Sequence, residues 1–291
     1  MSPFLRELRD AIKDFLEHGY SSEERLLMWT ERLRNATEEK IGGEDLYRYA
    51  ARRLTAAYDL EIGRERALKR HPGVARFTLN YVEPKLRAEL DRRIMASADL
   101  IKLNRTQAVD RTIQRFSGWA TSIPPINAIS PGLSASSRSG VIDTSQHIVK
   151  SARQIDFEQR RVMVDQTHKL IANIDNIIAT EGGAIAAVWH SHWRQPNYDY
   201  REPHKDRDLK VYAIRGNWAL KKGFMRAGTA GYLDEVTQPG EEVFCRCYLT
   251  YIYNVRSLPD EMKTDKWKKF TEGNLSVGRR AANFEGIRTG G

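Results

Sequence analysis

Apolar residues recur at helical spacing through most of the N-terminal part of the chain. Amphipathic stretches begin at Pro3, Ser21 and Glu44, and a further one resumes after a break at residues 71–73. Apolar positions three or four residues apart predict helices that bury one face. A serine directly before Pro3 is also a typical helix start, because proline suits the first helical position. We therefore expect residues 1–115 to form a helical domain.

The pattern changes between residues 116 and 143, where Arg138 and Asp143 are the only charged residues. Pro124-Pro125 and Pro131-Gly132 prevent a continuous helix in this stretch. A connection of this length is typical of an arm that lies on another protein or of a flexible linker. Its isoleucines and leucine are more apolar than a solvated linker requires, so we expect residues 116–143 to be an extended arm, with a linker as the alternative.

A second helical pattern runs from Thr144 to Thr180 and stops at Gly182-Gly183. After the glycines, short apolar or alternating segments predict strands at Ala184–Trp189, Leu209–Ile214 and Arg246–Tyr253. The expected fold class is α+β. It has a mainly helical N-terminal half and a long helix, followed by a small mixed α/β module with a short sheet.

The C-terminal half divides by composition into a module and a tail. Residues 144–256 carry the long helix and the predicted strands, so we expect them to form one α+β domain. After Leu258-Pro259 the sequence is polar and rich in lysine and arginine. We expect residues 257–291 to be a basic tail.

The composition is that of a folded protein: 41% of the 291 residues are hydrophobic and 29% are charged. No apolar run approaches the roughly 18 residues of a membrane span, and the N-terminus does not resemble a signal peptide. We therefore expect no membrane span and a cytoplasm-like compartment. The net charge of +9 favours proximity to nucleic acid or to an acidic protein. Basic and acidic residues alternate along most of the chain, however, which favours solvated helix faces over a dedicated binding site.

The two cysteines, Cys245 and Cys247, share one face of the predicted last strand. A disulfide between residues i and i+2 of a strand would be badly strained. Three of the seven histidines fall within fifteen residues, and two of them, His192 and His204, complete a possible zinc-ligand set with the cysteines. The alternative is structural and is favoured: the thiols are small buried groups and the histidines make hydrogen bonds. We therefore predict no cofactor, with zinc as the candidate that this set allows.

A carboxylate, a guanidinium and an imidazole lie close together at Asp199, Arg201 and His204. His204 would suit a general acid or base, with Arg201 stabilising anionic charge. The structural alternative pairs Arg201 with Asp199 across a turn and lets His204 cap a strand. The sequence contains no phosphate-binding loop, dinucleotide fingerprint or nucleophile elbow. We therefore favour the structural role and predict no catalytic residue.

The spacing of these residues resembles the phage Mu protein F-like family of minor head, or head morphogenesis, proteins. The family pattern is a strand ending in Trp, then Asp-x-Arg-x-x-His, and later Pro-Gly-x-x-x-x-Cys-Arg-Cys before a last strand. The matching residues are Trp189, Asp199, Arg201, His204, Pro239, Gly240, Cys245, Arg246 and Cys247. The resemblance covers roughly residues 145–255. Two segments depart from the pattern: His190–Tyr198 lengthen the first gap, and Lys205–Asp208 stand where the family has a glycine.

The resemblance implies a virion protein inside the capsid, assembled in the host cytoplasm and present in multiple copies around the portal vertex. Its expected partners are the portal protein, the major capsid protein and packaged DNA. Its expected role is head assembly or DNA packaging and ejection. One alternative is a nuclease-like or toxin-like enzyme carried in the virion, with His204, Arg201 and His192 as acid/base and phosphate-binding groups. Another is an internal head protein that binds DNA.

Overall fold

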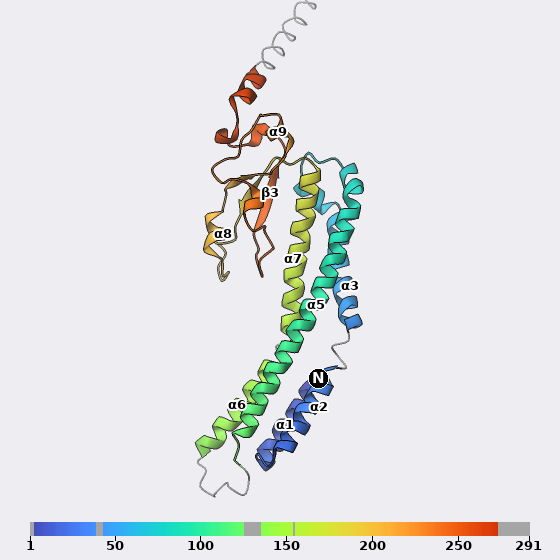
Figure 1. Ribbon diagram of the computed structural model, residues 1–291, viewed down its shortest axis with the longest axis vertical. Coiled ribbons are helices and arrows are strands. Elements are labelled where there is room, and N and C mark those ends of the chain that lie inside the picture. Colours follow the sequence, from blue (N-terminus) through green and yellow to red (C-terminus); the bar gives the residue numbers. More distant parts are fainter. Residues whose placement is uncertain (1–2, 39–42, 125–134, 154, 273–291) are drawn as a thin grey trace, which may run out of the picture. The chain divides into compact units, whose positions relative to one another are not determined.

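The computed structural model describes residues 3–38, 43–124, 135–153 and 155–272 (Figure 1). The chain divides into two compact units. The first, called the helical unit below, consists of Met1–Thr55 and Asp91–Gln166. The second, called the sheet unit, consists of Ala56–Leu90 and Thr167–Gly291. Each is described by itself.

Helices make up most of the described chain before the sheet. Their bounds are α1 (Pro3–His18), α2 (Glu23–Glu38), α3 (Gly43–Ile62), α4 (Arg66–Arg70), α5 (Phe77–Thr121), α6 (Ala135–Arg153) and α7 (Ile155–Glu181). The predicted starts near Pro3 and Ser21 are confirmed, as is the break at residues 71–73. The helix expected over Thr144–Thr180 is observed as α6 and α7, and residue 154 between them lies outside the described residues.

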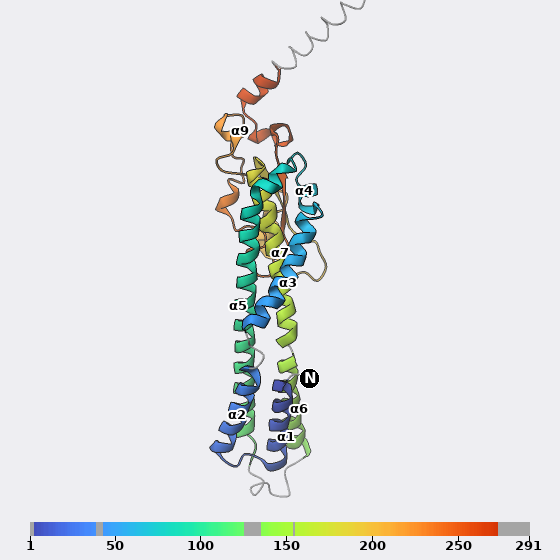
Figure 2. The same cartoon turned by 90° about the vertical axis from the view of Figure 1, so that its right-hand side faces the viewer.

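The helical unit is built around aromatic residues of α1 and α5. Phe15 and Phe116 are fully buried and meet edge to face, with their ring centroids 5.6 Å apart. In Figure 2, α1 runs beside α6, which contributes Ile148 and Ala152 to the same core. Burial of one apolar face per helix is the main source of stability for such an arrangement.

The segment expected to be an arm, residues 116–143, is largely helical where it is described. Residues 116–121 complete α5, and α6 begins at Ala135. Phe116, Trp119 and Ile123 are buried in the core of the helical unit. The apolar residues before residue 125 are therefore buried within the chain itself, and the described parts of the segment are helical, not an extended arm. The part of the segment at residues 125–134 lies outside the described residues.

The sheet unit contains a three-stranded antiparallel sheet in the order β2-β1-β3. The strands are β1 (Ala186–His190), β2 (Val211–Ala213) and β3 (Tyr248–Ile252), which confirms the three predicted strand positions. Short helices α8 (Glu202–Asp206) and α9 (Trp218–Lys221) and 3-10 turns at Leu233–Glu235, Val255–Ser257 and Asp260–Met262 complete the module. The α+β class is confirmed, with a mainly helical N-terminal half and a small sheet after a long helix.

Residues on the two faces of the sheet belong to two separate cores. One contains Trp189, Tyr212, Tyr251 and the two cysteines, and reaches Ala179 of α7. The other contains Ile185 and Ala213 together with residues that follow β3. Trp189 of β1 is paired with Leu249 of β3. Directly paired residues place their side chains on the same face of the sheet, so Trp189 and Leu249 both face the core that contains the cysteines.

The predicted basic tail begins later than residue 257. Leu258 and Met262 are buried in the second core of the sheet unit, at 3% and 0% exposure. Residues 265–272 are helical, and residues 273–291 lie outside the described residues. Composition did not indicate that Leu258 and Met262 are buried, because the charge of the lysines that follow Leu258 dominates the composition of the segment.

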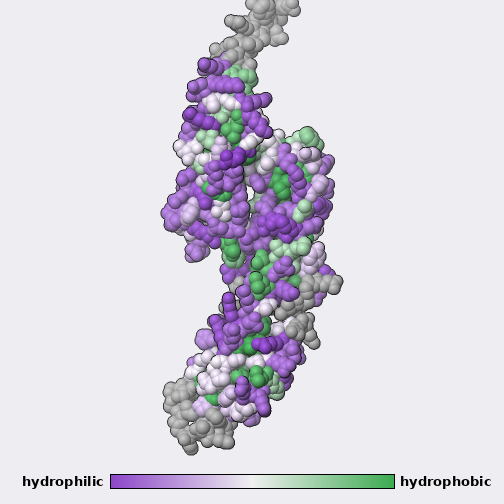
Figure 3. Space-filling model, in the orientation of Figure 1, coloured by the Kyte–Doolittle hydropathy of each residue, from purple (hydrophilic) through white to green (hydrophobic). Residues whose placement is uncertain are grey.

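The surface is mostly hydrophilic on the face drawn in Figure 3, and its apolar residues form small separate groups. Single exposed apolar side chains such as Phe77 and Phe157 are ordinary on a folded protein. None of the described helices is both long enough and apolar enough to cross a membrane.

Candidate metal centre

The two motif segments of the sequence meet inside the sheet unit. His204 lies in α8, and its side chain is only 3% exposed. Its Nδ1 atom is 3.7 Å from Sγ of Cys245 and 3.6 Å from Sγ of Cys247. Both thiols are also buried. An imidazole and two thiols that stand some forty positions apart in the chain therefore form one compact cluster.

The other ring nitrogen of His204 faces a carboxylate. Nε2 lies 3.2 Å from Oε1 of Glu242, and Oε2 of the same carboxylate pairs with Nε of Arg201 at 2.5 Å. Arg201 also donates a hydrogen bond to the carbonyl of Val243. The structural alternative that paired Arg201 with Asp199 is therefore corrected: Asp199 is exposed, and the partner of Arg201 is Glu242.

Glu242 is the site residue that the sequence analysis missed. It stands between Pro239-Gly240 and the cysteines, but Glu241 beside it offers the same chemistry. Only the fold distinguishes the two, because the turn that leads to Cys245 directs Glu242 toward His204. The position of Glu242 three residues before Cys245 is only a weak sequence signal for this role. It reflects a turn in which the Cys245 amide donates a hydrogen bond to the Glu242 carbonyl.

The turn before the cysteines needs unusual backbone conformations. Gly240 has φ +83°, and a Cβ there would stand 3.4 Å from the Lys169 backbone and from the Ala172 side chain of α7. Phe244 also has a positive φ, 59°, which is uncommon for a residue with a side chain. The Pro-Gly of the motif therefore has a local physical reason, since glycine permits both the conformation and the close approach.

The two thiols differ in acidity. The hydrogen bond with Cys247 lowers the pKa of Cys245 to about 5, aided by the backbone N–H groups of Gly240 and Cys247 and by His204, against the effect of burial. The same hydrogen bond, together with burial, raises the pKa of the Cys247 thiol well above its usual range.

Two polar groups beside the cluster have no hydrogen-bond partner among the described residues. They are Nε1 of Trp189 and Oγ of Ser191, and both atoms are buried. The ring of Trp189 also meets the His204 ring edge-on, with centroids 5.7 Å apart. The surroundings of the cluster thus include a buried N–H and a buried hydroxyl group without hydrogen-bond partners among the described residues.

Three of the four predicted metal ligands come together. Within the described part of the chain, His204, Cys245 and Cys247 are the one group of three or more potential ligands, with their ligand atoms all within 4.8 Å of one another. His192 does not join them. Its ring lies against Tyr248 and Tyr198 instead, at centroid distances of 5.8 and 6.4 Å.

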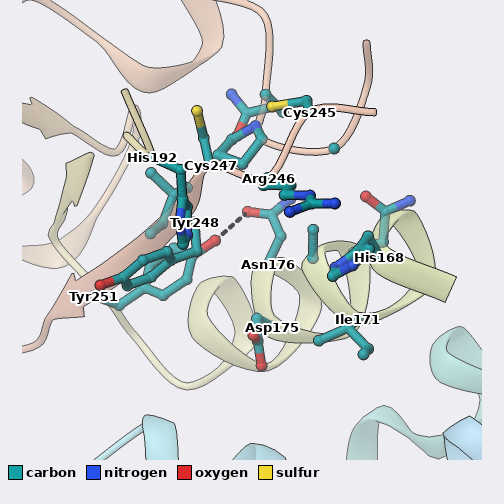
Figure 4. Close-up of a pocket in the computed structure, with 16 residues that line it drawn as sticks. His168, Ile171, Asp175, Asn176, His192, Cys245, Arg246, Cys247, Tyr248 and Tyr251 are labelled. Carbon is teal, nitrogen blue, oxygen red and sulfur yellow. Dashed lines mark hydrogen bonds between the residues drawn. The ribbon is translucent and has the colours of Figure 1, made fainter. Parts of the chain in front are cut away.

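A pocket of about 240 Å³ lies beside the cysteines, between α7 and the start of β3 (Figure 4). His168 and Asn176 line it from α7, and His192 lines it from the loop after β1. The Tyr251 hydroxyl donates a hydrogen bond to Oδ1 of Asn176 across this space, at 3.4 Å. The pocket is thus lined by imidazole, amide and hydroxyl groups and can accept a small polar ligand.

The remaining motif residues support the cluster or lie at its edge. Pro239 is buried together with Gly240. Arg246 is exposed, its guanidinium stands over the Tyr198 ring at 5.5 Å, and its amide donates to the Tyr198 hydroxyl. These contacts fasten the loop after β1 to the Cys-Arg-Cys segment. The burial of His204 also keeps it from direct contact with a macromolecular substrate.

The fold and the site together define an α+β protein in which a buried His/Cys/Cys cluster joins two distant motif segments. No family model, curated protein or solved structure matches this chain. The family resemblance therefore rests on the motif residues themselves.

Proposed function

We propose that this chain is a minor head protein of a tailed phage, with a C-terminal module of the Mu F-like kind. The observation that carries the proposal is the contact between the two halves of the motif. His204 of the first half touches both cysteines of the second, and Arg201 is tied to the turn between them through Glu242. Two motif halves that matched by chance would have no reason to meet in one buried cluster.

The cluster supports a structural role for the module. Its imidazole and thiols are buried and face one another, so they brace the segment around α8 against β3. On this proposal the protein lies inside the capsid near the portal, in several copies. Its helical part contacts the portal or major capsid protein, and its net charge of +9 suits the neighbourhood of packed DNA.

The test is the location of the protein in the phage that encodes it. Quantitative mass spectrometry of purified virions should find the chain at a small, fixed ratio to the portal protein. Deletion of its gene should give defective heads or particles that fail to deliver DNA. Absence of the chain from both virions and precursor heads, despite its abundance in the infected cell, would contradict the proposal.

A nuclease-like enzyme is the second candidate, and the pocket of Figure 4 is the observation that favours it. His168, His192 and Arg246 line that pocket and could serve proton transfer and phosphate binding. Incubation of the purified chain with RNA and DNA separates the two candidates. Degradation that is lost in His192→Ala, but kept in a control at the exposed His18, would favour the enzyme. No degradation is expected for a head protein.

A further inference from the structure

The spacing of the three buried ligand atoms is that of a zinc site. Zinc binds sulfur at about 2.3 Å and imidazole nitrogen at about 2.0–2.1 Å, so a tetrahedral ion holds sulfur and nitrogen roughly 3.6 Å apart. Nδ1 of His204 stands 3.7 Å from one cysteine sulfur and 3.6 Å from the other. Both nitrogen–sulfur distances fit this geometry, and the three ligand atoms all lie within 4.8 Å of one another.

The carboxylate of Glu242, next to Nε2 of His204, favours the tautomer in which Nδ1 can bind a metal. A neutral imidazole that donates Nε2–H to Glu242 leaves the Nδ1 lone pair directed at the two sulfurs. Metal-bound histidines almost always donate their second N–H in this way, which fixes the tautomer and the ring orientation. Arg201 in turn holds Glu242 by an ion pair. The outer contacts of a histidine ligand are therefore in place.

The chemistry of the donors selects a borderline or soft divalent cation. Two thiolates and one imidazole suit zinc and disfavour magnesium or calcium, which prefer oxygen ligands. Two thiolates also balance the charge of a divalent ion, whereas an uncompensated pair of thiolates in a buried place would be costly. The buried N–H of Trp189 and hydroxyl of Ser191 have no hydrogen-bond partners among the described residues, and the Trp189 ring meets the ring of the histidine ligand.

We propose that Nδ1 of His204 and the Sγ atoms of Cys245 and Cys247 bind a zinc ion. The described residues supply these three ligands. Both cysteines also line the 240 Å³ pocket, so water or a small donor from that pocket completes the coordination. The ion fastens α8 to the segment before β3, and Glu242 positions the histidine ligand. This inference stands independently of the proposed function, since it concerns the purified chain alone.

Metal analysis of the full-length chain tests the site. The protein is expressed with zinc in the medium, purified without chelator and analysed by inductively coupled plasma mass spectrometry. We expect about one zinc per chain in the wild type, and less than about a tenth in Cys245→Ser, Cys247→Ser and His204→Ala. The matched control is His192→Ala, which lines the same pocket outside the cluster and should retain the metal.

A second measurement keeps the test valid if these variants fold poorly. Wild-type chain stripped of metal is titrated with cobalt(II), which gives a sulfur-to-metal charge-transfer absorption only when thiolates are ligands. Zinc should displace the cobalt, and bound zinc should protect both cysteines from a thiol reagent. Two results would each overturn the proposal: wild type that takes up no metal after zinc addition, or bound cobalt that shows no sulfur-to-metal absorption.

Discussion

The turn at Gly240 shows how single residues set the geometry of the cluster. Gly240 combines a left-handed backbone with close contact to α7, and its N–H group is directed at the sulfur of Cys245. A side chain there would strain the backbone and press against Lys169 and Ala172. Gly216 has a similar positive φ, 71°, but no atom within 4 Å of an added Cβ. A comparison of alanine variants at Gly240 and Gly216 therefore separates the effect of backbone strain from the effect of crowding.

We predict that Gly240→Ala destabilises the protein more than Gly216→Ala does. Backbone strain alone should cost about 1–2 kcal/mol in both variants, because a residue with a Cβ is disfavoured at positive φ. Crowding against α7 should add to the loss only at Gly240. Urea unfolding of both variants measures the difference. Equal losses would show that α7 moves aside freely at this point.

At the scale of elements, a carboxylate connects the first two helices. Asp14 of α1 accepts hydrogen bonds from Nε of Arg25 and Nε1 of Trp29 in α2, at 2.8 and 2.7 Å. Burial raises the pKa of Asp14, but these hydrogen bonds and the charge of Arg25 outweigh it and hold the pKa below its ordinary value of 3.8. The ionised form is thus favoured by folding.

Stability of the α1–α2 pair should therefore fall in acid. Because the pKa of Asp14 is lower in the folded chain, its contribution is complete above the ordinary pKa of 3.8 and disappears as the pH falls through the folded pKa. Asp14→Asn should cost about 1–3 kcal/mol at pH 7 and remove part of this acid sensitivity. Amide hydrogen exchange in α1 and α2, followed as a function of pH, measures both the loss of stability and the acid sensitivity.

The exposed Asp10, on the same helix, provides the control. Asp10→Asn should leave both the stability at pH 7 and its acid dependence nearly unchanged. If the two variants behave alike, the hydrogen bonds of Asp14 do not hold the helices together.

The segment after β3 contributes a second element-scale prediction. Met262 is fully buried in the core formed with Ile185 and Val255, whereas Met95 of α5 is 60% exposed. Met262→Ala should cost about 2–5 kcal/mol, because it removes packed atoms and leaves a cavity. Met95→Ala should cost little. Urea unfolding of the two variants checks whether the residues after 257 are part of the fold or a dispensable tail.

For the whole molecule, the division into two compact units predicts where a bound metal acts. The cluster lies wholly within the sheet unit, and the aromatic core around Phe15 lies wholly within the helical unit. Binding to the native state alone stabilises that state by mass action, so removal of the ion should loosen the structure that holds its ligands.

We predict that chelation of zinc speeds amide exchange in α8, β1 and β3 and leaves α1 and α2 unaffected. The measurement is hydrogen exchange followed by mass spectrometry, with and without a chelator. Cys247→Ser should already show the fast exchange and respond no further to chelator. A chelator effect of equal size in α1 and α2 would contradict a local role of the ion.

The sequence by itself determined the fold class and the positions of most helices and strands outside residues 116–143. Helical periodicity and the start signal at Pro3 determined local structure, because apolar residues that recur every three or four positions define one buried face of a helix. The strand positions followed for the same reason, through alternation and the glycines before β1. The two cysteines, predicted on one face of the last strand, lie just before β3, which begins at Tyr248.

Only the tertiary structure decided which residues share a site and which segments share a core. It selected His204 over His192 beside the cysteines, and Glu242 over Asp199 as the partner of Arg201. It also placed Phe116 and Met262 in cores where composition had indicated an arm and a tail. The physical reason is that such contacts join residues tens of positions apart, and no local pattern records which of several similar side chains the fold brings within reach.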